Sequence, residues 1–212
     1  MKPILYNTEM VRAILAGRKT QTRRLIKAGD HAILHGGTFL GSPDGPKYGV
    51  ELDNHGVIVA PYQKGDVLYV RETWMEYAGK GDYIYFADMD DIDLASLKHA
   101  GFRWHPSIHM PKAAARIFLR VTDVRAERLQ EITAEGARSE GIRCYNVGMG
   151  EVAYSAAQSY EDAGNVFFED PVGAFATLWV NTIKIADLPR YGWAANPWVG
   201  VICFERCEKP GG

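Results

Sequence analysis

The chain has 212 residues and a net charge of −2, with 47% hydrophobic and 24% charged residues. These values are ordinary for a globular protein, and they exclude a fibrous or wholly disordered chain. Three cysteines are too few for a disulfide framework, which favours a reducing compartment. The first residues lack the layout of a signal peptide, and no apolar run reaches the roughly 18 residues of a membrane span. We therefore expect a cytoplasmic protein with no membrane partner.

The low net charge hides two blocks of opposite sign. Residues 18–27 carry five basic residues and no acid, whereas residues 82–93 carry five aspartates and no base. An acidic block is most often a solvated face. The basic block is more informative, because hydroxyl side chains alternate with its cations.

Six regular elements are predicted in chain order. Thr8 can cap a short helix that Gly17 ends, and Thr133 can cap a second helix that Gly141 ends. Asp170 followed by a proline starts a third helix. The predicted strands are residues 67–74, 114–124 and 197–205, and in the second of them Ile117, Leu119 and Val121 alternate with other residues.

No strand–helix–strand unit repeats along the chain, which argues against a doubly wound parallel sheet. We expect an α+β fold, a mixed β-barrel flanked by short helices. The whole chain, residues 1–212, is predicted to form one domain. Long loop insertions are expected at about 28–62, 75–110 and 143–168, the first of them with one hairpin.

Most motif-based chemistries find no support in the sequence. The chain has no phosphate-binding glycine loop, no dinucleotide fingerprint and no nucleophile elbow. Two histidine pairs have the spacing of helical metal ligands, His31 with His35 and His105 with His109. Pro106 interrupts the second pair, and neither pair has a third ligand nearby. We therefore expect no metal site and no cofactor.

The segment Gly17-Arg18-Lys19-Thr20-Gln21-Thr22-Arg23-Arg24 follows directly after the first predicted helix. A lysine partly removed from water loses proton affinity, so Lys19 could act as a base toward the Thr22 hydroxyl if a turn brings the two together. A nearby carboxylate would hold the ammonium in place. The residues alone equally allow a basic loop that contacts phosphates.

Four blocks of the sequence resemble the ASCH domain family, a branch of the PUA-like barrels. They are ILAGRKTQTRR at 14–24, KGDVLYVRETW at 64–74, LQEITAEGARSEGI at 129–142 and PWVGVICFE at 197–205. The first block is similar to the signature of small bacterial ASCH enzymes that hydrolyse N4-acetylcytidine. The chain as a whole resembles longer ASCH-domain proteins of phages and prophages. The resemblance covers about half of the residues, and the three insertions have no counterpart in the small enzymes.

The resemblance implies a catalytic set of a lysine, a threonine three residues later and a glutamate on a later helix. These match Lys19, Thr22 and Glu140, the last of which lies seven residues after Thr133. Glu72 is a competing carboxylate, which could instead form an ion pair with Arg71 or Arg23. The residues expected around the substrate are Thr20, Arg23, Arg24, Arg71, Glu72 and Trp74.

The activity that the resemblance implies is hydrolysis of the N4-acyl group of an N4-acylcytosine or N4-acetylcytidine-type nucleoside. Lys19 would take the proton of Thr22, whose oxygen would attack the acyl carbonyl while Glu140 orients Lys19. Backbone amides around Thr20–Thr22, or the Arg23 side chain, would stabilise the oxyanion. The alternatives are a non-catalytic module that binds RNA or a modified base and, third, a ribonuclease.

Overall fold

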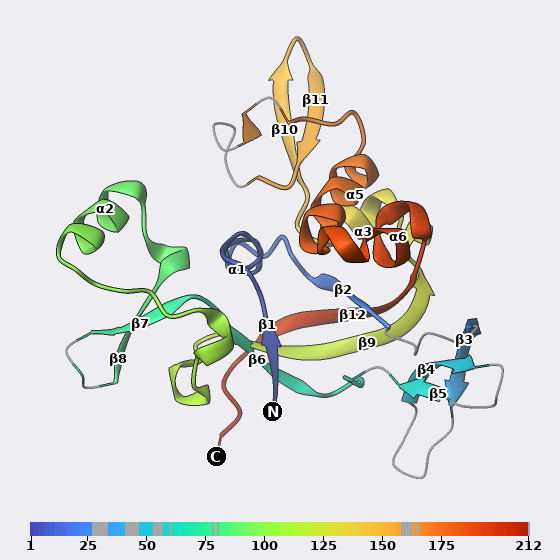
Figure 1. Ribbon diagram of the computed structural model, residues 1–212, viewed down its shortest axis with the longest axis horizontal. Coiled ribbons are helices and arrows are strands. Elements are labelled where there is room, and N and C mark those ends of the chain that lie inside the picture. Colours follow the sequence, from blue (N-terminus) through green and yellow to red (C-terminus); the bar gives the residue numbers. More distant parts are fainter. Residues whose placement is uncertain are drawn as a thin grey trace.

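The computed structural model describes residues 1–26, 61–77, 79, 81–157, 163–164 and 166–211, and the backbone alone of 34–40, 47–52 and 57–59. Its central element is a five-stranded sheet with the strand order β1-β6-β9-β12-β2 (Figure 1). The five strands are β1 (Lys2–Leu5), β2 (Gln21–Leu25), β6 (Val67–Arg71), β9 (Phe118–Arg128) and β12 (Trp198–Cys207). Within this sheet β1 and β6 are parallel and the other neighbours are antiparallel. This mixture of helices with a mostly antiparallel sheet is compatible with the predicted α+β class.

The two edges of the sheet, β1 and β2, are not joined by a backbone ladder among the described residues. A side chain links them instead, because Arg24 on β2 donates a hydrogen bond of 2.6 Å to the carbonyl of Leu5. The described strands thus form an open sheet, and the expected barrel closure is not confirmed.

Both faces of the central sheet are covered. On one face Ile117, Leu119 and Val121 are buried together with α1, as the expected alternation requires. The predicted bounds of this strand, 114–124, are wrong, because β9 runs from Phe118 to Arg128 and a 3-10 helix ends at Ala114. On the other face Phe175 and Trp179 pack against β12, and Figure 1 shows α3, α5 and α6 gathered beside β2 and β12. The helices are α1 (Thr8–Leu15), α2 (Asp91–His99), α3 (Ala134–Ser139), α5 (Pro171–Thr182) and α6 (Leu188–Tyr191).

Capping side chains set the starts of the helices. Thr133 caps α3 by accepting from the Gly136 amide at 3.0 Å, and Asp170 caps α5, as the sequence predicts. The predicted cap of α1 is wrong by one residue. Asn7, not Thr8, accepts from the amide of Met10 at 2.9 Å.

The three segments predicted as insertions contain regular structure of their own. The first holds a three-stranded sheet instead of one hairpin, although residues 27–33, 41–46, 53–56 and 60 lie outside the described part. The predicted strand 67–74 is also wrong at its end, because β6 stops at Arg71 and Trp74 begins a separate hairpin. The insertion strands are β3 (Leu34–Leu40), β4 (Lys47–Leu52), β5 (Val57–Val59), β7 (Trp74–Tyr77), β8 (Asp82–Tyr85), β10 (Arg143–Gly148) and β11 (Glu151–Ser155). Short 3-10 helices are η1 (Phe86–Asp88), η2 (Ser107–His109), η3 (Lys112–Ala114), η4 (Leu129–Glu131), η5 (Ile185–Asp187) and η6 (Trp193–Ala195).

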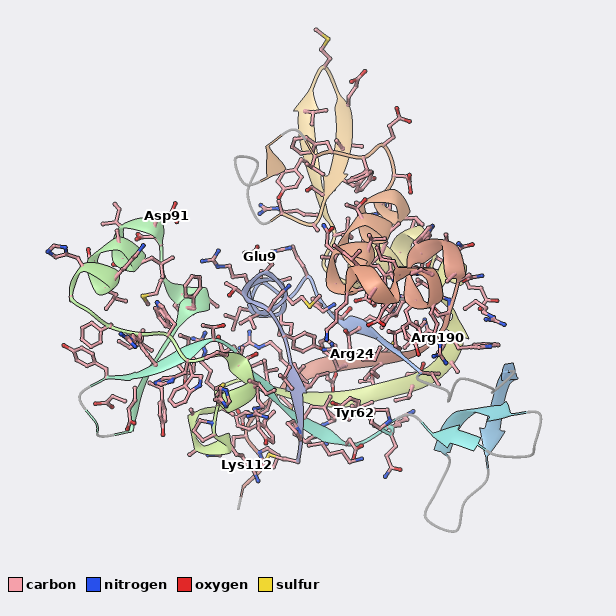
Figure 2. All side chains as sticks on the ribbon, in the orientation of Figure 1. Glu9, Arg24, Tyr62, Asp91, Lys112 and Arg190 are labelled. Atoms are coloured by element: carbon pink, nitrogen blue, oxygen red, sulfur yellow. The ribbon has the colours of Figure 1, made fainter. Side chains whose placement is uncertain are left out.

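The acidic block has specific roles in the second insertion. Asp90 caps α2 by accepting from the amide of Asp93, and Asp91 and Asp93 lie in the first turn, where the helix dipole favours negative charge. Figure 2 shows Asp91 at one end of the molecule, far from Arg24. Among the helices in the described residues, none has the length and apolar character needed to cross a membrane.

Candidate functional site

A tight turn between α1 and β2 positions the basic segment. Gly17 has a φ of +72°, which suits glycine, and the amides of Arg18 and Lys19 both donate to the Ala13 carbonyl, at 2.9 and 3.1 Å. The amide of Thr20 then donates to the carbonyl of Ser139 at 2.9 Å. The segment is therefore fixed at one end to α1 and at the other to the end of α3.

The turn places Lys19 against Glu140, the residue that ends α3. The Nζ atom of Lys19 lies 2.7 Å from the Oε2 atom of Glu140 and 2.8 Å from its backbone carbonyl oxygen. Lys19 is 2% exposed and Glu140 is 4% exposed. Burial lowers the pKa of Lys19, and the Glu140 carboxylate opposes this shift. The pairing of these two residues, predicted from the sequence, is present in the structure.

Glu140 is itself held by Arg23. The Nη1 atom of Arg23 lies 3.1 Å from Oε1 of Glu140, while the rest of its guanidinium binds Glu127 on β9. Glu127 also accepts a hydrogen bond of 3.1 Å from Arg125. The side chain of Arg23 is 1% exposed, so it orients Glu140 and does not present a surface to a substrate. Sequence reasoning missed Glu127, because only the register of β9 against β12 and β2 brings it to Arg23.

Tyr6, which the sequence did not indicate, lies beside Lys19 and also interacts with Thr22. The ring centroid of Tyr6 lies 5.8 Å from the Nζ atom of Lys19 and 5.2 Å from the guanidinium carbon of Arg24. Burial raises the pKa of Tyr6 well above its ordinary value, although Arg24 and a hydrogen-bonding contact with Thr22 act to lower it. Even so, the buried Tyr6 hydroxyl makes no hydrogen bond of standard geometry within the described part of the chain. Tyr6 thus touches both predicted catalytic side chains and keeps its own proton.

Three predicted substrate contacts lie elsewhere. Glu72 forms a two-pronged ion pair with Arg116, with both distances 2.9 Å, so the expected pairing with Arg71 or Arg23 is wrong. Arg71 donates to backbone carbonyls of the second insertion, and Trp74 packs between aromatic rings, with its centroid 5.0 Å from that of His105. These side chains anchor the second insertion to the sheet, which leaves Glu140 as the carboxylate beside Lys19.

The other two predicted contacts lie next to the site. Thr20 is exposed, and its carbonyl accepts a hydrogen bond of 2.8 Å from the amide of Phe204. Because the Thr20 amide donates to Ser139, it is not placed to stabilise an oxyanion. Arg24 lies in the middle of the molecule, as Figure 2 shows, with its guanidinium between the edge strands.

A small cavity adjoins the carboxylate. Its volume is about 20 Å³, enough for about one water molecule. Residues that line it are Asn7, Glu9, Met10, Ala13, Glu140, Gly141, Ala156 and Leu178. A cytidine does not fit a cavity of this size. Lys19 and Thr22 are themselves only 2% exposed, so a reaction of these side chains with a nucleoside requires the residues that cover them to move apart.

The described residues hold no group of three or more histidine, cysteine, aspartate or glutamate side chains placed to bind a metal ion. His31 lies outside the described part, and nothing is described of the His35 side chain. His105 packs against Trp74, with the two rings tilted by 32°.

Comparisons with known proteins give no independent guide. No protein-family model matches the chain, and neither the curated proteins nor the solved structures contain a significant match.

Proposed function

We propose that this protein is an amidohydrolase that removes the N4-acyl group of an N4-acylcytosine or N4-acetylcytidine-type nucleoside, releasing cytidine and a carboxylic acid. The observation that carries the proposal is the buried Lys19–Glu140 pair, with Thr22 and Lys19 both in contact with Tyr6. Burying a charged lysine costs stability that a leucine in the same space would not, and such costly groups cluster at functional sites. The motifs shared with the small ASCH enzymes supply the substrate class.

The first step is attack by Thr22. Neutral Lys19 takes the proton of the Thr22 hydroxyl, and the threonine oxygen bonds to the acyl carbon to form a tetrahedral oxyanion. Lys19 then returns the proton to the N4 nitrogen as the carbon–nitrogen bond breaks and cytidine leaves. In the second step Lys19 takes a proton from water, whose oxygen attacks the acyl carbon of the acyl-threonine ester. As the carbon–oxygen bond to Thr22 breaks, Lys19 returns the proton to the threonine oxygen, and the carboxylic acid is released.

The remaining residues orient these two. Glu140 accepts hydrogen bonds from Lys19 and from Arg23, and these bonds fix the orientation of the Lys19 amino group. Tyr6 has the properties of an oxyanion donor, because its hydroxyl is buried, remains protonated and lacks a regular partner among the described residues. Tyr6 would thus take the place of the backbone amide of Thr20, which was expected to stabilise the oxyanion but donates to Ser139.

The finer fold assignment belongs to the same proposal. We infer that the open sheet is an ASCH-type, PUA-like fold carrying three insertions, since the link from Arg24 to Leu5 joins edge strands that a full barrel would pair. The three cysteines are free thiols, as in a protein that acts in the reducing cytoplasm.

The proposal is tested by incubating the purified protein with N4-acetylcytidine, other N4-acylcytosines and a short RNA that contains N4-acetylcytidine. Release of free cytosine or cytidine is followed by absorbance and chromatography, with and without a chelator. We expect the protein to hydrolyse the acylated nucleoside or base, and we expect this activity to persist in the presence of the chelator. If no N4-acyl compound is cleaved while RNA binds with a steep salt dependence, the protein is a binding module instead. Cleavage of the RNA backbone would identify a ribonuclease.

A further inference from the structure

A second and larger pocket lies on the outer side of the segment that carries Glu140. Its volume is about 410 Å³, against about 20 Å³ for the cavity beside Glu140. The pocket is formed by Arg18, the end of α3 and the start of β10. The lining residues are Arg18, Glu135, Arg138, Ser139, Ile142, Arg143 and Cys144.

Positive charge dominates this pocket. Three arginines line it, and Glu135 is the only carboxylate among the lining residues. Partial burial lowers the pKa of Arg18, and the neighbouring charge of Arg143 lowers it further. The fold thus holds two guanidinium groups close enough to repel each other, an arrangement that a bound anion would relieve.

Neighbouring groups hold the three arginines at the pocket. An Nη1 atom of Arg18 donates to the Gly141 carbonyl at 3.4 Å, and Arg138 donates to the Tyr154 hydroxyl at 3.2 Å. The guanidinium carbon of Arg143 lies 5.2 Å from the ring centroid of Tyr145. Side chains positioned in this way lose less entropy when they bind a ligand.

We propose that this pocket binds the phosphate group of a nucleotide or of an RNA backbone. Guanidinium groups match the geometry of phosphate oxygens and pair with them through two hydrogen bonds at once. The volume of about 410 Å³ exceeds that of one phosphate group. Because Arg18 precedes Lys19 and Ser139 precedes Glu140, the phosphate would lie one residue away from the candidate catalytic pair. The proposal concerns binding alone and holds whether or not Lys19 takes part in hydrolysis.

The test is titration calorimetry of the full chain with cytidine, cytidine monophosphate and a short oligocytidine. The variant is Arg138→Gln combined with Arg143→Gln, two exposed side chains outside the core. Arg103→Gln, at an exposed arginine in the loop after α2, is the matched control for loss of positive charge. Circular dichroism confirms that each variant is folded.

We expect a phosphate-bearing ligand to bind more tightly than cytidine, and the double variant to weaken it by about tenfold or more, as loss of charged hydrogen bonds should. Arg103→Gln should leave the affinity unchanged. Binding of the monophosphate identifies a terminal phosphate as the ligand, whereas binding of the oligocytidine alone identifies the phosphodiester backbone. For the oligocytidine, the slope of log affinity against log salt should shrink by about 0.7 for each phosphate that the variant no longer neutralises. The proposal fails if phosphate adds nothing to the affinity for cytidine, or if the double variant binds as the wild type does.

Discussion

Replacing Glu140 with glutamine tests the electrostatics of the site without testing its chemistry. The glutamine keeps the shape of the side chain but removes the negative charge that faces Lys19 at 2.7 Å and Arg23 at 3.1 Å. Removing one partner of a buried ion pair costs about 3–5 kcal/mol. For a chain of this size each kcal/mol lowers Tm by about 2–4 °C, so we expect a fall of about 6–20 °C where Lys19 is charged.

The loss of stability should depend on pH in a defined direction. The pKa of Lys19 is lower in the folded than in the unfolded chain, and Glu140 is the main group that opposes this shift. In Glu140→Gln the folded pKa therefore falls further. Between the folded and unfolded pKa values the unfolded chain binds more protons, so stability rises with pH. The pH range between the folded and unfolded pKa values of Lys19 is wider in Glu140→Gln than in the wild type. The stability of Glu140→Gln should therefore approach that of the wild type as pH rises.

Thermal unfolding at about pH 6.5 and about pH 9.5 measures this difference. Glu205→Gln is the control, because Glu205 is an exposed carboxylate on β12, and surface substitutions change stability by about 0.5 kcal/mol or less. A difference in Tm between Glu140→Gln and wild type that is equal at the two pH values would refute the reasoning. So would a difference no larger than that of Glu205→Gln.

Three further predictions concern pH, backbone and capping. The rate of hydrolysis should rise with pH and level off below pH 10.5, the ordinary pKa of lysine, because burial lowers the pKa of Lys19; a rate that falls over this range would contradict a lysine base. Gly141→Ala should lower the free energy of unfolding in urea more than Gly150→Ala does. Both glycines have a positive φ, which costs alanine about 1–3 kcal/mol in backbone strain. Only at Gly141 would the new Cβ also lie 3.2 Å from the Cβ of Ala13. Asn7→Ala should cost about 1 kcal/mol in the same assay and Thr8→Ala much less, and the reverse order would restore Thr8 as the cap.

Local signals in the sequence predicted local structure well. The caps of α3 and α5, the alternation in β9 and the extent of β12 each depend on residues within a few positions of one another. The start of α1 was missed because Asn7 and Thr8 are both good caps and only the backbone selects between them.

Interactions between distant segments were beyond the reach of sequence patterns. Lys19 and Glu140 could be paired only through a shared motif, and nothing in the chain order indicates that Arg23 would bind Glu127. Glu72 shows the same limit, because its partner Arg116 lies 44 residues away on the approach to β9. Tyr6 reads as an ordinary core aromatic, and only its position between Lys19, Thr22 and Arg24 distinguishes it.

The most direct measurement of the central claim is the turnover of N4-acetylcytidine by Lys19→Arg, Thr22→Ala and Thr22→Ser, each compared with wild type after its fold is verified by circular dichroism. Arginine keeps the positive charge but does not lose its proton, so Lys19→Arg should show no hydrolysis. Thr22→Ser retains a hydroxyl and should keep part of the rate, whereas Thr22→Ala should keep almost none. Wild-type turnover by a folded Lys19→Arg or Thr22→Ala protein would contradict a lysine-activated threonine.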